Sequence, residues 1–594
     1  MTRHGPFTGY RLQPNAEVID LTEYDRVGAS AGAARQTDVD TQEDLAADFP
    51  MLSIEDDEDG QAPVGYTPPI DLDEEAEDDV DELRELTPRE VADLFSRATT
   101  TPLGAQAVMT PLGCVEIDMC IELSDGDFLC VKGFTRNHVK GILLRRTRWM
   151  QGSLPKKCNE VCAILKTQSA LDPGIGDCLV VRNLNDIVAI RDIIFTNQPF
   201  PNLRLNMLEQ AEQWPDNSFF KLGPLVCRWK KTVVSDVSNK VVIESITKLN
   251  QDECTTGTGI PHYVLRYNWI GSHVSDLLQY AYGDLCTGGG GTARGASDSG
   301  FVLKFFLDHW KDACRTLRRN WRDVDILHAD TFTFLTEMDD QSFRVDVLHI
   351  SFPCQPHSPA HTTEGKNDEA NIATAYSVID ILKKCRPRIV TFEQTSGIVT
   401  HNGGYHFRAL LHQLTAMDYG VRSGIIHCDE YGNCQPRKRL IIIAACPGET
   451  LPPFPAPTHG NSLRLQPRVT IRDRLRPLRD RAIEPHMQYS HPKPGMPYSD
   501  KQPLRKCITT DGGDSNLHPK GDRTFTLQEL AALQGFPPEH RFYPKVQGAT
   551  SIKKQIGNAV PPPVAKAIFL QIIKTMRETD RAMAAERARV FVID

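Results

Sequence analysis

The chain has 594 residues, 24% of them charged, and a formal net charge of −10. This length suffices for several domains with sizeable cores, and the composition is that of a soluble protein. We expect neither a membrane span nor a secretory signal peptide, because no segment approaches the apolar length that a span needs. The sixteen cysteines are therefore expected to be reduced thiols and not a disulfide framework.

The charge is distributed unevenly along the chain. Residues 1–90 hold 25 acidic and 6 basic residues, whereas the remaining residues hold 52 acidic and 61 basic ones. The acidic runs at 55–59 and 73–79 repel themselves and offer little to bury, so we predict a disordered acidic tail over 1–95. It is either a DNA-mimicking segment that competes for a basic cleft or a solvated tail. The basic remainder suits a DNA partner.

A small β-rich domain is predicted over 105–235. Residues 115–119 alternate apolar and polar, 124–127 form a turn, and 128–131 resume the apolar pattern, which indicates a hairpin. Further strands are expected near 141–144, 159–165 and 178–181. Residues 236–275 look like a connector to the next domain.

The segments Gly126 to Val131 and Cys158 to Val161 resemble the bromo-adjacent homology (BAH) domain. That resemblance implies chromatin proteins as partners, and the alternative is an unrelated β domain that shields its neighbour. Cys158 and Cys162 are the closest approach to a metal-binding pair. Because no comparable pair follows them, we predict buried thiols and no metal site.

From residue 276 onward the pattern is that of an α/β domain. A strand at 278–285 precedes the glycine run 288–291, a helix begins at Thr292, and a second strand at 301–307 ends in Asp308. The glycines let a backbone approach a ligand, and a carboxylate about twenty residues later suits ribose hydroxyls. With a third strand ending at Asp330, the unit predicts a site for S-adenosylmethionine.

Three further strands are predicted, and each has a chemically active residue close to one end. The strand at 345–350 precedes Cys354, the strand at 388–392 precedes Glu393, and the strand at 440–445 follows Arg437 and Arg439. Helical spacing over 371–384 supplies the crossover between the first two. Ligands bind at such strand ends in open α/β sheets, so these side chains are candidates for one site.

Four ordered motifs now carry a family resemblance: Pro353-Cys354-Gln355, Glu393-Gln394-Thr395, Gln435 to Arg439, and Gly557 to Pro562. In this order they resemble the C5-cytosine DNA methyltransferases, over 276–594. Glu-Gln-Thr, in place of the commoner Glu-Asn-Val, looks like the fungal RIP-defective branch, which is associated with silencing of repeated DNA. The resemblance implies a Rossmann-like S-adenosylmethionine-dependent methyltransferase domain behind the BAH-like domain.

The resemblance also implies roles for individual residues. Cys354 would be the nucleophile that adds to C6 of cytosine, Glu393 would bind N3 of the base, and Arg439, with Arg437, would hold O2 and a nearby phosphate. Pro353 and Gln435 would help to bind the substrate. Gln394 departs from the usual asparagine, which orients the loop bearing the nucleophile, so turnover is in question.

The cofactor residues carry over in the same way. The implied set is Asp284, Gly288, Gly289, Gly290, Gly291, Asp308, His309, Asp330, Asn558 and Val560. Asp308 would bind the ribose and Asp330 the adenine. The family usually has phenylalanine at the position of Cys286 and commonly tryptophan at that of His309, so two aromatic contacts differ.

The region from 450 to 520 lacks periodicity and is rich in proline and arginine, and it is placed where the family carries its target-recognition region. We expect this region to grip phosphates and to read bases; the alternative is a solvated insert. The arginines are Arg464, Arg468, Arg472, Arg474, Arg476, Arg479 and Arg481. After it, Thr526 and Glu529 form a capping box that opens a helix closed by Gly535. A final helix is predicted from 564 to about 587.

The sequence therefore predicts a nuclear, S-adenosylmethionine-dependent C5-cytosine methyltransferase acting on double-stranded DNA. One alternative is a methyltransferase-fold protein that binds DNA or chromatin and silences without efficient turnover. Another is an RNA cytosine methyltransferase, which the extra β domain and the acidic tail disfavour.

Overall fold

The computed structural model describes residues 106–135, 137–157, 159–167, 178–199, 223–236, 238, 240–271, 279–338, 340–352, 377–479, 481, 485–510 and 517–590. These residues fall within one compact unit, Val80–Asp594. The predictions for the acidic tail and for Pro353 and Cys354 lie outside the described residues.

The predicted α/β part is built on a mixed sheet with the strand order β14-β13-β12-β15-β16-β18-β17. The bounds are β12 Ala281–Leu285, β13 Val302–Asp308, β14 Asp325–His328, β15 Val347–Ile350, β16 Ile389–Gln394, β17 Gly420–His427 and β18 Lys438–Ala445. Strands β12 to β16 are parallel, and β18 runs antiparallel between β16 and β17. The predicted strands of this part are confirmed, with bounds shifted by at most three residues.

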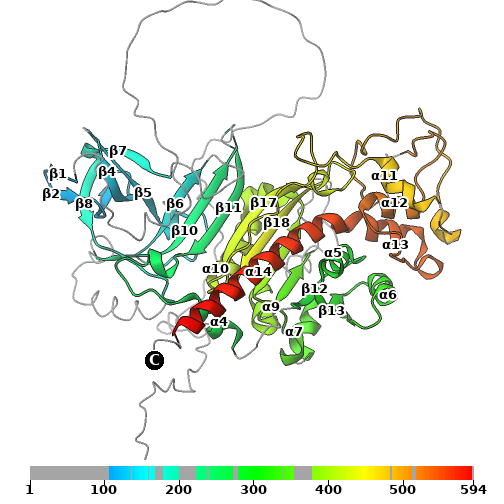
Figure 1. Ribbon diagram of the computed structural model, residues 1–594, viewed down its shortest axis with the longest axis horizontal. Helices are drawn as coiled ribbons and strands as arrows, with labels where there is room; N and C mark the ends of the chain where they lie inside the picture. Colours follow the sequence, from blue (N-terminus) through cyan, green and yellow to red (C-terminus); the bar gives the residue numbers. More distant parts are fainter. Residues whose placement is uncertain are drawn as a thin grey trace, which may run out of the picture. The chain divides into compact units, whose positions relative to one another are not determined.

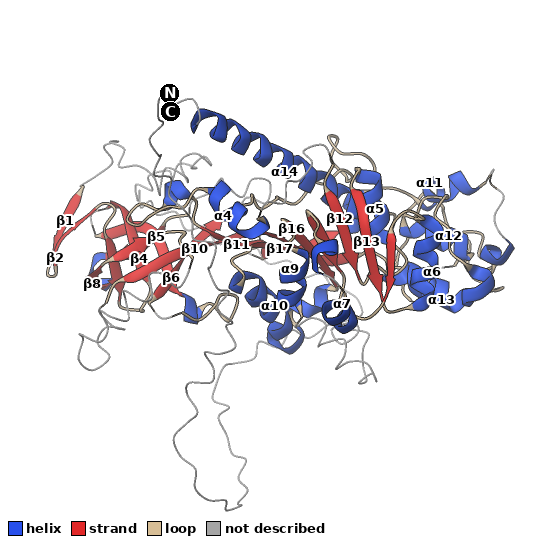
Figure 2. Cartoon of the chain, turned by 90° about the horizontal axis from the view of Figure 1, so that it is seen from below, coloured by secondary structure: helices blue, strands red, loops and turns tan. Residues whose placement is uncertain are grey.

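Helices cover both faces of this sheet, as expected when strands are apolar on both sides. The helix bounds are α4 His262–Ile270, α5 Gly291–Ser299, α6 Lys311–Asn320, α7 Thr331–Glu337, α9 Val378–Cys385, α10 Tyr405–Ala416 and α14 Pro562–Val590. In β13 the buried Phe305 packs with α7, α9 and α10, whereas its neighbour Phe306 packs with α5, α6 and α14. Figure 2 shows α14 and α9 with α10 on opposite sides of the strands.

The long helix α14 lies across the sheet and packs against α5 (Figure 1). By length and composition alone, the helical stretch Lys545–Ala585 is apolar enough to cross a membrane, contrary to our expectation that no segment would be. However, 67% of its most apolar window is buried inside the protein. Ile568, Phe569 and Ile572 belong to the core between α14 and the sheet, so this apolar pattern is that of a core helix.

The N-terminal part is rich in β structure. Its strands are β1 Ala107–Thr110, β2 Gly113–Glu116, β3 Cys120–Leu123, β4 Phe128–Phe134, β5 His138–Arg146, β6 Glu160–Thr167, β7 Val180–Asn183, β8 Ile187–Arg191, β9 Ile193–Phe195, β10 Leu225–Ser235 and β11 Val241–Lys248. The predicted turn at 124–127 joins β3 and β4, but the strand before it begins at Cys120 and not at Val115. Val115 lies in β2, and Asp118, with a φ of 69°, interrupts the extended run between the two strands.

Residues 236–275 form more than a connector, because they contain β11 and α4. Strand β11 pairs with β10 on one side and with β17 on the other. The β-rich part and the α/β part therefore share one continuous sheet.

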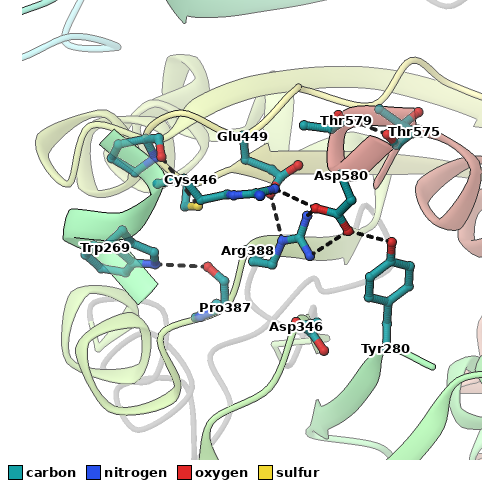
Figure 3. Close-up of polar contacts among 12 residues, drawn as sticks. Trp269, Tyr280, Asp346, Pro387, Arg388, Cys446, Glu449, Thr575, Thr579 and Asp580 are labelled. Carbon is teal, nitrogen blue, oxygen red and sulfur yellow. Dashed lines mark hydrogen bonds and ion pairs between the residues drawn. The ribbon is translucent and has the colours of Figure 1, made fainter. Parts of the chain in front are cut away.

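A buried ion cluster ties together segments that are far apart in the sequence (Figure 3). Arg388, just before β16, contacts Glu449 at 2.7 Å and Asp580 of α14 at 2.7 Å. Arg266 of α4 contacts both carboxylates as well, at 3.3 and 2.7 Å, and the Tyr280 hydroxyl donates to Asp580. Two guanidinium groups and two carboxylates thus compensate each other where α4 and α14 meet the sheet.

The region after β18 is mostly irregular, as predicted, and it rests on two helices. They are α12 Leu527–Gln534 and α13 Pro544–Asn558, with the short α11 Ile471–Leu475 beside α12. The predicted capping box is confirmed, since Thr526 caps Glu529 and Glu529 returns the bond. Gly535 closes α12 with a φ of 104°.

Candidate active site

The candidate residues converge because of the direction of β18. Parallel strands β15 and β16 end at the same edge of the sheet, with Phe352 after β15 and Glu393 near the end of β16. Since β18 is antiparallel to β16, its beginning lies at that edge too, and Gln394 is paired with Leu440. Arg439 is therefore brought beside Glu393, although 46 positions separate them in the sequence.

A pocket of about 460 Å³ opens at this edge, within the range of small-molecule sites. Its lining comes from the glycine loop, the end of β13, the end of β15, Glu393 and the end of α13. The lining residues are Cys286, Thr287, Gly288, Gly289, Gly291, Thr292, Asp308, His309, Trp310, Ser351, Phe352, Glu393, Lys554, Gln555, Asn558, Ala559 and Val560. One pocket thus joins predicted cofactor residues to a predicted catalytic residue.

The glycine loop is shaped by what packs against it. A Cβ on Gly291 would lie 2.2 Å from the carbonyl oxygen of Val560, and one on Gly290 would lie 2.8 Å from the Trp321 ring. Gly290 is also left-handed, with a φ of 82°, and starts α5. The loop needs glycine because the last motif of the chain lies directly on it.

Asp308 lies at the end of β13 with both carboxylate oxygens on backbone donors. Gly288 N and Trp310 N each donate to it at 2.7 Å. Burial raises the pKa of Asp308, and the bonds from Trp310 and Gly288 act in the opposite direction. A carboxylate has about four acceptor positions, so two remain for hydroxyl groups of a ligand.

Asp284 and Asp330 do not line the pocket. Asp284 is fully buried beneath the loop, where it accepts hydrogen bonds from Tyr282 and Thr292 at 2.8 and 2.7 Å. Burial raises the pKa of Asp284 to about 7, against the lowering effect of these bonds. Asp330 is exposed and caps α7 through Thr333 N at 2.8 Å. In this structure Asp284 holds the first turn of α5 to β12, and Asp330 caps α7.

The aromatic rings that line the pocket include those of Trp310, one position after His309, and Phe352. His309 also lines the pocket, and its side chain is 69% exposed. Cys286 adopts a left-handed conformation with a φ of 58°, which is uncommon for a residue other than glycine. Burial raises the pKa of the Cys286 thiol, and the charges of Asp308 and Asp284 raise it further.

Glu393 and Arg439 form an ion pair. Arg439 Nε lies 2.6 Å from Glu393 Oε1, and both side chains are largely buried. Among the described residues, no side chain pairs with the second oxygen, Oε2. The arginine fixes the carboxylate through one oxygen and leaves the other available.

The side chains of Gln435 and Arg437 are buried in the protein interior and do not line the described pocket. Gln435 is fully buried, and its amide accepts from Ile508 N and donates to Gln534, both at 2.8 Å. Arg437, 2% exposed, donates to the carbonyl oxygens of Ile508 and Gly557. Burial lowers the pKa of Arg437 to about 10. These side chains fasten the start of β18 to the recognition region and to the last motif.

Gln394, which stands where the family usually has asparagine, makes a hydrogen bond to the segment before Cys354. Gln394 Nε2 donates to the carbonyl oxygen of Phe352 at 2.8 Å, in the interior of the protein. Phe352 is the last described residue before Pro353 and Cys354. The longer glutamine thus holds the backbone that leads into the predicted nucleophile.

Comparisons with known proteins give one family for this part of the chain. The profile described as C-5 cytosine-specific DNA methylase matches residues 280–479 and 483–574. The type II methyltransferase M.NgoMIV of Neisseria gonorrhoeae is 26% identical over 328 residues, which cover 51% of this chain and 99% of that protein. M1.HphI of Haemophilus parahaemolyticus is 25% identical over 361 residues, which cover 52% of this chain and 91% of that protein.

Residues 280–574 belong to the C5-cytosine DNA methylase family. Among solved structures, the Dnmt2 methyltransferase of S. pombe is similar, with a TM-score of 0.37 and 14% identity over 50% of this chain and 98% of that chain. The EhMeth methyltransferase of Entamoeba histolytica has a TM-score of 0.38 and 17% identity, over 50% of this chain and 98% of that chain.

S-adenosyl-L-methionine is the cofactor of this methylase domain, and the residues fit it. The buried carboxylate of Asp308 keeps acceptor positions for ribose hydroxyls, and Trp310 offers an apolar ring. The glycine loop presents backbone without side chains to the ligand. Among the described residues of the methylase, no group of three or more His, Cys, Asp or Glu residues could hold a metal ion.

Sequence reasoning missed several lining residues of the methylase pocket. Trp310 follows the predicted ribose carboxylate by two positions, a spacing that could have singled it out. Lys554 and Gln555 precede the recognised Gly557 motif on α13 and had no separate signal. Phe352 was read only as part of the loop before Cys354.

The arginines of the recognition region have partners within the methylase itself. Arg468 pairs with Asp429, Arg472 with Asp500 at 2.6 Å, and Arg481 with Glu539 at 2.9 Å. Arg474 donates to the carbonyl oxygen of Gly432. Four of the seven arginines thus have partners within the protein, and the expectation that this region grips phosphates and reads bases stays a prediction.

Proposed function

We propose that this chain transfers a methyl group from S-adenosyl-L-methionine to C5 of a cytosine in double-stranded DNA, through a covalent adduct on Cys354. The observation that carries the proposal is the single pocket that joins the glycine loop and Asp308 to Glu393, with Phe352 leading into the nucleophile loop. The bound cofactor supplies the methyl group. The remaining chemistry falls to residues of this chain.

Cytosine C5 is a weak nucleophile, and addition of a thiolate at C6 makes it enamine-like. The thiolate of Cys354 forms the bond to C6 while Glu393 stabilises the negative charge at N3 by hydrogen bonding and transient protonation. After C5 has gained the methyl group, a base removes the C5 proton. The electron pair then expels the cysteine as thiolate, which restores the aromatic ring and the enzyme.

The structure supports these roles through the arrangement of Glu393. Arg439 holds one oxygen of its carboxylate, so the other can be directed to the base without loss of orientation. A side chain cannot reach C6 and N3 of a cytosine that remains stacked in a duplex, so we expect the target nucleotide to be flipped into the pocket. We expect Arg439 to contact the flipped base. Arg437 donates to the carbonyl oxygens of Ile508 and Gly557, so its expected role is to hold the start of β18, on which Arg439 lies.

The biological setting is a further part of the proposal. We assign the chain to the nucleus, to the silencing of repeated DNA, and its β-rich N-terminal part to contacts with chromatin proteins. The support is the BAH-like pattern and the Glu-Gln-Thr motif of the fungal RIP-defective branch. Bisulfite sequencing of repeated DNA in cells lacking the protein should show lost methylation, and unchanged methylation would refute this setting.

The catalytic proposal is tested by covalent trapping on duplex DNA containing 5-fluorocytosine, in the presence of S-adenosyl-L-methionine. Fluorine cannot leave C5 as the proton does, so the adduct persists after methyl transfer. We expect an adduct with the wild type and with Cys114→Ala, an exposed cysteine outside the pocket, and none with Cys354→Ala.

No adduct from a folded wild-type protein that still binds DNA would overturn the catalytic proposal. That result would favour a methyltransferase fold that silences by binding alone. Trapping on structured RNA in preference to duplex DNA would instead indicate the RNA-directed activity.

A further inference from the structure

A second pocket, separate from the methylase site, is lined almost entirely by arginine. It has a volume of about 730 Å³, and its lining is Arg315, Arg318, Arg319, Arg322, Arg541 and Tyr543. None of these residues belongs to a motif of the methylase or lines the cofactor pocket.

The arginines converge because of helical spacing and a clamp. Arg315, Arg318 and Arg319 follow the i, i+3, i+4 pattern of α6 and so share one face of the helix. Arg322 follows two residues after the helix ends at Asn320. Asn320 at the end of α6 then exchanges two hydrogen bonds with the backbone of Arg541, at 2.9 and 3.0 Å. This clamp adds a fifth guanidinium and the ring of Tyr543 to the same face.

The described lining of this pocket is rich in positive charge. Asp312 pairs with Arg315 at 2.9 Å, and Arg318 donates to the carbonyl oxygen of Ile326. No acidic residue is among those that line the pocket. Like charges one helical turn apart destabilise a helix by a few tenths of a kcal/mol per pair, so the arrangement costs stability unless an anion occupies it.

The chemistry of the pocket matches a nucleic-acid backbone. Guanidinium groups bind phosphate through paired N–H donors, which suits them to phosphodiesters. The guanidinium of Arg319 lies over the Tyr543 ring at 5.1 Å from its centroid, and that ring remains 37% exposed. An arginine and aromatic pair of this kind is typical of sites that combine phosphate contacts with a stacking surface.

The position of the pocket relates it to the methylase site. Helix α6 begins one residue after Trp310, which lines the cofactor pocket, and its last turn carries Arg318 and Arg319. Ten residues of helix span about 15 Å, which is less than one turn of duplex DNA, about 34 Å. Helix α13 packs along α6 through a hydrogen bond between Ser551 and Asp312, so the two sites share a rigid frame.

We propose that this arginine pocket binds backbone phosphates of DNA outside the active site and so provides a second, sequence-independent DNA contact. The inference rests on DNA being the partner, but its readout is binding and not methyl transfer. A failure here therefore leaves the trapping experiment unaffected.

The test compares full-length Arg318→Ala/Arg322→Ala/Arg541→Ala with the wild type on a duplex of dA and dT only. Such a duplex offers no cytosine to the active site. A matched control removes three exposed charges from one face of α14: Lys574→Ala/Arg577→Ala/Arg581→Ala. Fluorescence anisotropy over a range of salt concentrations gives both the affinity and its salt dependence.

We expect the pocket variant to bind roughly tenfold more weakly at low salt and to lose about 2 to 3 from the slope of log K against log salt, since each phosphate contact contributes about 0.9. The control should match the wild type. Replacing the same arginines by lysine should retain the salt slope, because the charge remains, but should lower the affinity, because the paired N–H donors are lost.

The proposal is overturned if the pocket variant, shown to be folded by circular dichroism, keeps the wild-type affinity and slope. It is also overturned if the pocket binds inorganic pyrophosphate by calorimetry while duplex DNA does not compete. Equal losses in the control variant would show a general charge effect and would likewise contradict a built site.

Discussion

The hydrogen bond from Gln394 to Phe352 makes a sharp prediction about catalysis. Gln394 Nε2 lies 2.8 Å from the Phe352 carbonyl oxygen, and its side chain is 2% exposed. Gln394→Met keeps the length of the side chain and removes the donor. Gln394→Asn keeps the amide but withdraws it by one bond of about 1.5 Å, beyond hydrogen-bonding distance. Both changes leave the same buried carbonyl without its partner.

The expected magnitude follows from that unpaired group. A buried acceptor that loses its donor costs about 1 to 3 kcal/mol. If the loss of the hydrogen bond makes the reactive position of the loop bearing Cys354 less favourable by that free energy, methyl transfer slows by roughly 5- to 150-fold. The effect should fall on the rate of the chemical step and leave DNA affinity close to that of the wild type, since Gln394 contributes no exposed charge.

The assay is single-turnover methyl transfer to a cytosine-containing duplex, measured with labelled cofactor at saturating DNA. Thr395→Val is the matched control, because the buried Thr395 hydroxyl has no hydrogen-bond partner among the described residues and its loss should change little. The reasoning fails if Gln394→Met transfers methyl groups at the wild-type rate. It fails equally if Thr395→Val slows the reaction as much.

Two further predictions concern the framework around the site. Asp580→Asn should lower the free energy of unfolding by roughly 3 to 5 kcal/mol in urea denaturation, whereas the exposed Glu578→Gln on the same helix should change it by under about 0.5 kcal/mol. Burial opposes ionisation of Asp580, but the guanidinium beside it lowers its pKa overall. The stabilisation by Asp580 is therefore present above its unfolded-state pKa, near 3.9, and should disappear as the pH falls through its folded-state pKa. A difference between the wild type and Asp580→Asn that does not change with pH would contradict this reasoning. Gly291→Ala should weaken cofactor binding by roughly tenfold in calorimetry, because the added Cβ would lie 2.2 Å from the carbonyl oxygen of Val560. Gly133→Ala should leave cofactor binding unchanged, because no atom lies within 4 Å of the added Cβ.

The parts of the fold that follow from local pattern were predictable. The helix after Thr526 was anticipated with its cap and its end, because the capping box and Gly535 act within a few residues of each other. The strands that carry the site were found for the same reason, since apolar runs mark them directly. By contrast, β11 in 241–248 was read as part of a connector, because its identity depends on partners near residues 230 and 422.

The candidate site shows the same division. Motif order located Glu393 and Arg439 correctly at one edge, but it could not assign a role to each residue of a motif. Gln435 and Arg437 belong to the recognised sequence and are buried against Ile508. Their function depends on a backbone segment some seventy positions away, which no local pattern reveals. A motif therefore identifies a place in the fold more securely than it identifies contacts with substrate.

Net charge gives a misleading measure of how this protein holds DNA. Outside residues 1–90 basic residues exceed acidic ones by nine, yet many arginines are neutralised internally, as Arg388 is by Glu449 and Asp580. Such groups release no counterions on binding and add nothing to its salt dependence. What matters is where guanidinium groups outnumber carboxylates, and the pocket on α6, whose described lining holds five arginines and no acidic residue, is such a place. Removing three arginines from this pocket should therefore lower the slope of log K against log salt by more than removing three other exposed charges does. That difference distinguishes a local phosphate site from a diffuse basic surface.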